Sequence, residues 1–352
     1  MAKKRKTLPK NFKELIEAND ITALKAMYDT CEIDAYDNGF DKSTALHTFG
    51  VPEELVRWLA EQGADIEFRD HYNRTPLHVQ SRYWNGKVAV LIELGADIMA
   101  RDCYGNTALH VAATNKRIGF VEEFLACGVD INVENNRKQT PLSCVLAFCQ
   151  NADIASAAVV AEVLLNAGAK ITPDMAENVE RIGKDFEFRR DGFNKDYLPE
   201  TDTGLTKLYK LFNVEPVAKR QIYDGTSPIT VPSGKWYEQH DALWQLLVPG
   251  SGQAKTVQGE VIRTSGKMAR EIMDNGGINW GDDFRKMLTA LVGYFSMGNA
   301  LTSAELEESE KLAKRLKSGN GDDEPERLME LAVQWVKENP NPLSLGETEY
   351  KR

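Results

Sequence analysis

The sequence repeats a short pattern at intervals of 31, 32 and 33 residues, and this period constrains the fold more than any other feature. The pattern is Thr-x-Leu-His or a close variant, and it begins at Thr44, Thr75, Thr107 and Thr140. A second marker, Gly-x-Asp or Gly-x-Lys, follows in phase at Gly63, Gly95, Gly128 and Gly168. Threonine caps the first turn of a helix well, and glycine readily takes the left-handed conformation that ends one. Each unit is therefore predicted to contain short helices that begin and end at these markers.

The interior of each unit follows the same order. Apolar residues recur at helical spacing between the two markers, as at Leu55 and Leu59. Polar, turn-forming segments follow three of the glycines, at residues 65–74, 97–106 and 130–139. The unit resembles the ankyrin repeat, whose period of about 33 residues and Thr-Pro-Leu-His signature it carries. The resemblance implies stacked pairs of helices joined by protruding turns, which we call fingers.

The array is predicted to cover residues 11–172 and to contain about five units. Residues 12–30 are predicted to form a degenerate first unit that caps the array, with a finger over 33–42. The last unit is longer than the others, and residues 149–157 are predicted to be an insertion between its helices. Residues 49–52 and 80–81 depart from the family pattern, so we expect weaker stacking at these two places.

Three histidines stand in register within the repeats, which raises the question of a metal site. Equivalent residues of stacked helices lie about 8–10 Å apart, whereas zinc binds nitrogen at about 2.0–2.1 Å. The spacing therefore argues against a metal, and the histidines are expected to hydrogen-bond between neighbouring turns, as in the family that the array resembles. The predicted structural repeat residues are Thr44, His47, Thr75, His78, Thr107, His110 and Thr140.

The period is lost after Pro173, and the rest of the chain is predicted to be mostly helical. Residues 173–232 are predicted to connect the halves through one or two helices, and residues 233–339 to form a domain of five helices. Residues 1–10 are predicted to be a basic disordered tail and residues 340–352 a loose tail. The predicted fold class is all-α, an ankyrin-repeat solenoid followed by an α-helical bundle domain.

Part of the second half has a resemblance of its own. Residues 205–285 are similar to the C-terminal part of a group of bacterial ankyrin-repeat proteins with no assigned activity. The similarity is carried by residues 208–212, 224–228, 243–254 and 257–260. It implies a bacterial source and brings no known chemistry.

Composition and charge limit the class of protein. The formal net charge is −10, from 43 basic and 53 acidic residues, and this argues against nucleic-acid binding. The five cysteines are scattered, with neither a Cys-x-x-Cys pair nor histidines at zinc spacing, so a reducing cytoplasm is the expected location. The basic N-terminus has no apolar stretch behind it, so we expect neither a signal peptide nor a membrane anchor.

No catalytic residue, metal or cofactor is predicted. Residues 249–256 look like a phosphate-binding loop, but Pro249 and Ala254 occupy the two positions where that loop needs glycine. Glu271 and Asp274 could share a divalent cation on one helix face, yet no second carboxylate pair is evident. A solvated helix face explains these two residues better.

The better candidate is a binding surface on the array. Finger tips and the inner faces of the first helices carry specificity in such arrays, and Tyr, Trp and Arg dominate interface hot spots. The predicted partner-binding residues are Tyr36, Tyr72, Arg74, Arg82, Tyr83, Trp84, Tyr104, Asn106, Arg137 and Lys138. Within this set, residues 82–84 are the favoured cluster.

Three functions remain open at this point. The first is a non-catalytic interaction or scaffold protein that binds a protein partner through the finger tips and the concave face. The second is an immunity protein or inhibitor that neutralises a toxin or phage factor. The third is a metal-dependent hydrolase in the helical domain, with the array recruiting its substrate.

Overall fold

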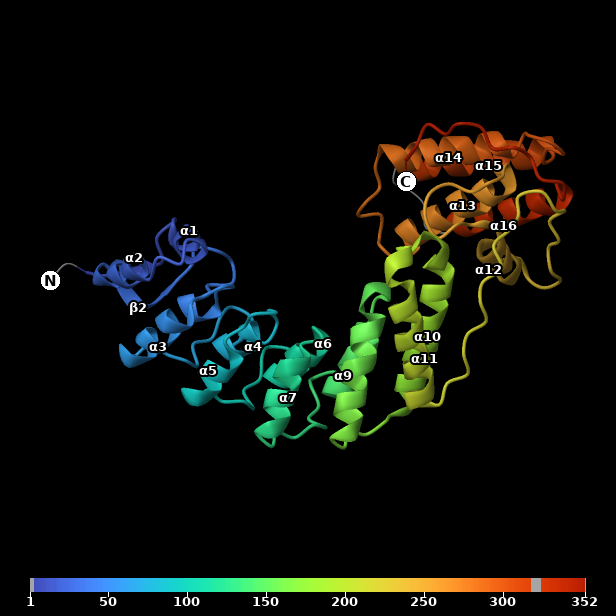
Figure 1. The fold of residues 1–352 in the computed structure, drawn as a ribbon. Coiled ribbons are helices and arrows are strands. Elements are labelled where there is room, and N and C mark those ends of the chain that lie inside the picture. The colour runs from blue at the N-terminus through green and yellow to red at the C-terminus, as the bar shows by residue number, and fades with distance from the viewer. Residues whose placement is uncertain (1–2, 318–323, 352) are drawn as a thin grey trace. The chain divides into compact units, whose positions relative to one another are not determined.

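The computed structural model describes residues 3–317 and 324–351. Residues 1–2, 318–323 and 352, which belong to the predicted N-terminal tail, helical domain and C-terminal tail, lie outside the described residues. The described residues form sixteen α-helices and a single two-stranded sheet, which confirms the all-α fold class. They divide into two compact units (Figure 1). The first comprises Met1–Lys184 and Lys195–Val217, and the second comprises Asp185–Asn194 and Ala218–Arg352.

The first unit begins with a small cap. Its elements are β1 Arg5–Thr7, α1 Phe12–Glu17, α2 Ile21–Ala26, the 3-10 helix η1 Met27–Asp29 and β2 Cys31–Tyr36. Strand β1 pairs in parallel with β2, and the side chain of Leu8 is buried just after it. The prediction of a disordered tail over 1–10 is therefore wrong for residues 5–8, because β2 supplies a hydrogen-bonding edge that the basic sequence does not reveal.

The repeats follow as pairs of short helices. They are η2 Ala45–His47 with α3 Glu53–Glu61, α4 Pro76–Gln80 with α5 Val88–Glu93, α6 Ala108–Thr114 with α7 Ile118–Ala126, and α8 Pro141–Ala147 with α9 Ile154–Asn166. All four marker glycines, at 63, 95, 128 and 168, have positive φ. The predicted helix ends are therefore present, and glycine is used there because it tolerates the left-handed backbone.

The fingers share one turn built on an acidic or amide side chain. Oδ1 of Asp70 accepts hydrogen bonds from the amides of Tyr72 and Arg74, and Asp102 and Asn135 repeat this arrangement in the next two fingers. Backbone amides also bond from one finger to the next, as from Cys103 to the carbonyl of Tyr72. These turns hold the fingers in register along the array.

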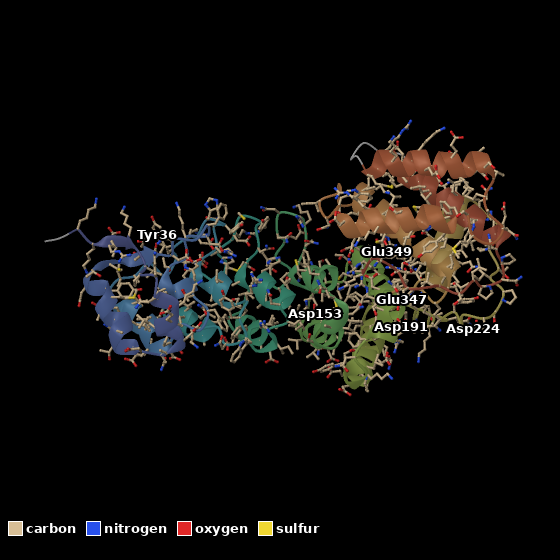
Figure 2. All side chains as sticks on the ribbon, turned by 90° about the horizontal axis from the view of Figure 1, so that it is seen from above. Tyr36, Asp153, Asp191, Asp224, Glu347 and Glu349 are labelled. Atoms are coloured by element: carbon tan, nitrogen blue, oxygen red, sulfur yellow. The ribbon has the colours of Figure 1, made fainter. Side chains whose placement is uncertain are left out.

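The last repeat differs from the others where the insertion is predicted. Residues 151–153 form the 3-10 helix η3 Asn151–Asp153, and α9 is longer than the second helix of any other repeat. Asp153, labelled in Figure 2, forms an ion pair of 2.9 Å with Lys116 of the preceding repeat. The extra residues therefore lengthen one helix and tie it to its neighbour.

The first unit extends past the boundary predicted at residue 172. It includes most of α10 Pro173–Arg189, the 3-10 helix η5 Lys195–Tyr197 and all of α11 Leu198–Phe212. Helix α11 lies along α9, and a Cβ at Gly204 would stand 2.7 Å from the Cα of Ala155. The predicted connecting region therefore begins with helices that cover the last repeat, because the apolar face of α9 needs a partner.

The second unit is a bundle around one buried helix. Its elements are η4 Arg190–Gly192, α12 Trp236–Leu247, α13 Val257–Met273, α14 Asp282–Tyr294, α15 Ser303–Lys317 and α16 Glu324–Glu338. Helix α13 packs against α12, α14 and α16 and is buried along most of its length (Figure 1). These five α-helices match the five that the sequence predicts for residues 233–339.

The chain after α16 is ordered and packs on this bundle. The amide of Val257 donates to the carbonyl of Leu343, and Tyr350 is only 2% exposed. The prediction of a loose tail over 340–352 is therefore wrong for residues 340–350, because the start of α13 offers polar partners to them. Within residues 3–317 and 324–351, no helix is both long enough and apolar enough to cross a membrane.

Candidate functional site

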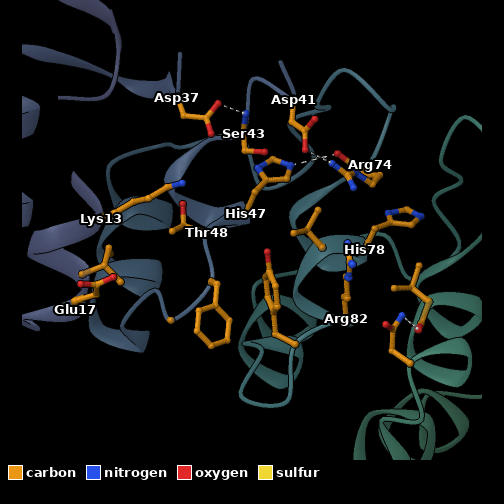
Figure 3. Close-up of a pocket in the computed structure, with 17 residues that line it drawn as sticks. Lys13, Glu17, Asp37, Asp41, Ser43, His47, Thr48, Arg74, His78 and Arg82 are labelled. Atoms are coloured by element: carbon orange, nitrogen blue, oxygen red, sulfur yellow. Dashed lines mark hydrogen bonds and ion pairs between the residues drawn. The ribbon is translucent and has the colours of Figure 1, made fainter. Parts of the chain in front are cut away.

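A groove of about 820 Å³ opens on the first unit and is the main candidate site (Figure 3). It lies over the cap, the first two fingers and the helices η2, α4 and α6. Its lining includes Lys13 and Glu17 from α1, Phe49 after η2, and Arg82 and Tyr83 after α4. The groove therefore collects residues from segments up to 102 positions apart in the sequence, from Lys13 to Asn115.

One wall of the groove is aromatic. The ring of Phe49 is 48% exposed and meets the ring of Tyr83 edge to face, with centroids 4.9 Å apart. Phe49 is available because η2 is a single 3-10 turn, and Gly50 then reverses the chain at φ 74°. The departure from the repeat pattern at residues 49–52 thus places an aromatic side chain in the groove where a longer helix would have continued.

The buried side chain of Gln80 compensates for that short helix. Its Nε2 donates to the carbonyl oxygens of Leu46 at 2.8 Å and Thr48 at 3.1 Å, and its Oε1 accepts from the amide of Lys87. A one-turn helix leaves its last carbonyls without intrahelical donors, so the amide of Gln80 takes their place. The two departures at 49–52 and 80–81 therefore support each other through hydrogen bonds, and the weaker stacking expected at these places stays a prediction.

The upper wall in Figure 3 is polar, and its charged side chains form hydrogen bonds with other groups of the protein. Arg74 donates from Nε to Asp70 at 2.7 Å and from its terminal nitrogen to Asp41 at 2.9 Å. Burial alone lowers the pKa of Arg74, but the two carboxylates raise it above the ordinary value. Asp37 accepts from the amides of Gly39 and Ser43. These groups line the groove, and their charges are already compensated by hydrogen bonds and ion pairs within the protein.

Three charged side chains at the groove have no ionic or hydrogen-bonding partner among the described residues. They are Lys13 and Glu17 on α1 and Arg82 beyond α4. An aromatic wall flanked by unpaired charges of both signs suits a protein segment better than a single small ion.

The three register histidines stabilise the stack. The Nδ1 atoms of His47, His78 and His110 accept from the amides of Thr44, Thr75 and Thr107, and each Nε2 donates to a carbonyl of the next finger. Burial lowers the pKa of His47 and His110 to about 4 and also lowers that of His78. All three are therefore neutral at pH 7. Thr140 caps α8 by accepting from the amide of Ser143.

The predicted partner-binding residues do not form one surface: some line the groove, and others lie on the fingers or elsewhere in the first unit. Arg74, Arg82 and Tyr83 line the groove. Tyr36 ends β2 (Figure 2), and Trp84 is 72% exposed but lies outside the groove lining. Tyr72, Tyr104, Arg137 and Lys138 lie on the fingers, and Tyr72 stacks under Arg74. Asn106 bonds to both Asp102 and Asn135 and so belongs to the finger turns.

Sequence reasoning missed several residues of the groove. Lys13, Glu17 and Phe49 were not predicted. Outside the groove lining, Phe40 was not predicted either, although its ring is 69% exposed on the first finger beside His71. The broken helix pattern at residues 49–52 could have pointed to Phe49. No comparable signal existed for Lys13 or Glu17, because a cap unit has no strict pattern.

The segment that looks like a phosphate-binding loop has a structural role. Glu260 on α13 is fully buried, accepts from the amide of Ala254 and from Arg263, and accepts from the hydroxyl of Tyr350 at 2.7 Å. Burial raises the pKa of Glu260, but Arg263 and these hydrogen bonds lower it below the ordinary value. Gln258 likewise bonds to the backbone of Asn339, Asn341 and Leu343. Residues 253–263 therefore clamp the end of the chain.

The carboxylate pair considered for a cation is also explained locally. Oε1 of Glu271 accepts from the amide of Asn279 at 2.6 Å, and its Oε2 accepts from the side chains of Asn275 and Asn279. Glu271 thus organises the turn between α13 and α14. The expectation of a solvated helix face is wrong for Glu271, which is 5% exposed because these hydrogen bonds hold it under the turn, whereas Asp274 is exposed. In the described part of the chain, no three or more His, Cys, Asp or Glu side chains gather in a way that could hold a metal ion.

Paired short helices, finger turns and the threonine–histidine capping define an ankyrin-type array. The family model for ankyrin repeats, in three copies, matches residues 49–135 and 83–174. This region of the chain is therefore made of ankyrin repeats, as the sequence pattern predicts. None of the curated proteins matches the chain. Ankyrin repeats indicate a protein–protein interaction module and are typically non-catalytic.

Proposed function

We propose that this protein is a non-catalytic interaction protein that binds a protein partner in the groove of its first unit. The observation that carries the proposal is the contact between the exposed Phe49 and the half-buried Tyr83, which forms an aromatic wall in a groove of about 820 Å³. Aromatic side chains that remain partly exposed in a preformed hollow are the usual anchors of protein interfaces. The unpaired Lys13, Glu17 and Arg82 lie where the polar rim of such an interface would be.

The proposal refines the surface predicted from the sequence. Arg82 and Tyr83 remain in the binding site, Phe49 joins them, and the groove becomes its centre. Trp84 is exposed beside it and would lie at the edge of the interface. Asn106 has a structural role, and Arg74 acts by fixing the polar wall.

The proposal also includes the source and compartment inferred from the sequence. The similarity of residues 205–285 supports a bacterial protein. Five free cysteines, three of them buried, suit a reducing compartment such as the cytoplasm.

Photo-crosslinking tests the groove directly. Benzoylphenylalanine is placed at Phe49 in one sample and at Phe148 in another, and each is irradiated in a lysate of the organism that encodes the protein. Phe148 is the matched control because it is also 48% exposed on the first unit and lies outside the groove lining. The proposal expects a discrete crosslinked protein from position 49 and not from position 148.

The identified partner is then purified and its affinity measured by calorimetry. Phe49→Ala with Tyr83→Ala is expected to weaken binding at least tenfold, since buried aromatic anchors contribute roughly 2 kcal/mol or more. Phe148→Ala is expected to bind like the wild type. Equal affinity for the double variant and the control would overturn the assignment of the groove.

A further inference from the structure

The second unit has a small hollow that shares no lining residue with the groove. It has a volume of about 190 Å³ and lies between α12, α13 and the start of α16. Its floor is formed by Trp236, His240 and Trp244, and its rim carries Asp241, Asp274 and Glu326. This volume is below the roughly 300–1,000 Å³ of sites for drug-sized ligands, so it suits a single side chain or a group of that size.

The floor of the hollow is closely packed. A Cβ at Gly266 would lie 2.5 Å from Cζ3 of Trp244 and 3.0 Å from Cε1 of His240. Glycine at this position therefore lets both rings pack directly on the backbone of α13. Nε2 of His240 bonds to the hydroxyl of Ser265 at 3.0 Å, and burial lowers the pKa of His240 to about 4. The floor is thus rigid, aromatic and uncharged at pH 7.

The rim is negatively charged and unneutralised. Asp241, Asp274 and Glu326 are exposed, and none of them has an ion pair among the described residues. By contrast, Glu307 and Glu308 of α15 are paired with Lys311 and Arg327. Arg270 is the one basic residue in the lining, so three carboxylates and one guanidinium leave a net charge of −2 around an aromatic floor.

Arg270 shows what this floor accepts. Its guanidinium carbon lies 4.2 Å from the centre of the Trp244 ring, within the range of a cation–π contact. The chain itself therefore places a cation against one of these rings. Trp236, which is only half-buried on the same hollow, has no such cation among the described residues and offers its ring to another.

We propose that this hollow binds an alkylammonium or alkylguanidinium group, as presented by a lysine or arginine side chain of a protein partner. The carboxylates supply the charge, and the tryptophans replace part of the water that the alkyl chain and the cation lose. The site lies wholly within the second unit and does not depend on the groove. The second unit would therefore bind a cationic side chain independently of any partner in the groove.

The test uses n-butylammonium and n-butylguanidinium chloride as probes of the full-length protein. Binding is followed by the indole N–H resonances of Trp236 and Trp244, assigned with Trp236→Phe and Trp244→Phe. Saturable shifts at millimolar concentrations are expected for both cations. The neutral n-butanol and the anionic butyrate, at matched ionic strength, are expected to bind at least tenfold more weakly.

Isosteric variants separate charge from shape. Asp241→Asn, Asp274→Asn and Glu326→Gln together are expected to weaken both cations at least tenfold, and their exposed positions should leave the fold unchanged. Glu307→Gln with Glu308→Gln is the matched control and is expected to bind like the wild type. Equal binding of n-butanol and n-butylammonium, or unchanged affinity in the triple variant, would overturn the proposal.

Discussion

The hydroxyl of Tyr350 donates a hydrogen bond of 2.7 Å to Oε1 of Glu260, ninety positions earlier in the chain. Both side chains are almost completely buried, and Arg263 bonds to the same carboxylate. A buried carboxylate is tolerable only when its lone pairs are occupied. The end of the chain therefore completes the core of the second unit.

Removing that hydroxyl should destabilise the second unit. Tyr350→Phe leaves Arg263 as the remaining donor to Oε1 of Glu260, and a hydrogen bond to a charged group contributes about 1.5–3 kcal/mol. Urea unfolding followed by tryptophan fluorescence should show a lower midpoint, because four of the six tryptophans lie in this unit. Tyr237→Phe removes a hydroxyl from an exposed ring and serves as the control. Equal midpoints for the two variants would contradict the clamp.

Gln80 should be essential to the start of the array. Gln80→Ala removes the donor from the carbonyls of Leu46 and Thr48, and we expect a loss of about 1–3 kcal/mol in the free energy of unfolding of the first unit. Far-UV circular dichroism during urea unfolding measures it. Gln62→Ala is the matched control, because its side chain is exposed at the end of α3. A loss in both variants alike would show that Gln80 has no special role.

The array should lose stability in mild acid. The pKa of His110 is about 4 in the folded chain against an ordinary value of 6.5, so between these values the unfolded chain binds a proton that the folded chain does not. Stability is therefore complete above pH 6.5 and falls toward pH 4, by up to about 1.4 kcal/mol per pH unit for each such histidine.

His110→Ser tests this origin, because it copies Ser143 of the fourth repeat. The variant is expected to be less stable at pH 7.5 but to lose less on going from pH 7.5 to pH 5. Urea midpoints of the first unit at several pH values give the comparison. An unchanged pH dependence in the variant would show that His110 does not titrate in this way.

Gly204 should be required for α11 to cover α9. A methyl group there would meet the backbone of Ala155 at 2.7 Å, so Gly204→Ala is expected to destabilise the first unit by roughly 1–3 kcal/mol. Gly119→Ala on α7 is the control, since a Cβ there meets nothing within 4 Å. Alanine in an open helix position is expected to be neutral or to stabilise by up to about 1 kcal/mol. The thermal unfolding midpoint should therefore fall in Gly204→Ala and stay the same or rise in Gly119→Ala.

The repeats were predictable because their signals are local. The bond from the amide of Thr75 to His78 spans three residues, and the left-handed glycines act within one turn. The five C-terminal helices were predictable for the same reason, since a capping box such as Thr302 with Glu305 is formed by residues only three positions apart. Helix boundaries accordingly agree to within a few residues.

The candidate site was predictable only in part. Tyr83 and Arg82 were chosen by residue type, and the groove includes them. Phe49, Lys13 and Glu17 were not chosen, because their role depends on which segments the stack brings beside them. Trp84 was favoured for the same reason as Tyr83, yet only the backbone turn after α4 decides which of the two rings faces the groove.

The sequence by itself determined the period, the helix ends and the all-α class, since each depends on contacts within a few residues. The tertiary structure decided the partners that lie 32 to 90 positions away: the carbonyls to which Gln80 donates, the aromatic wall of the groove, and the burial of Tyr350 against Glu260. Such pairings are selected by packing and by the need to satisfy buried polar groups, and no local pattern encodes them.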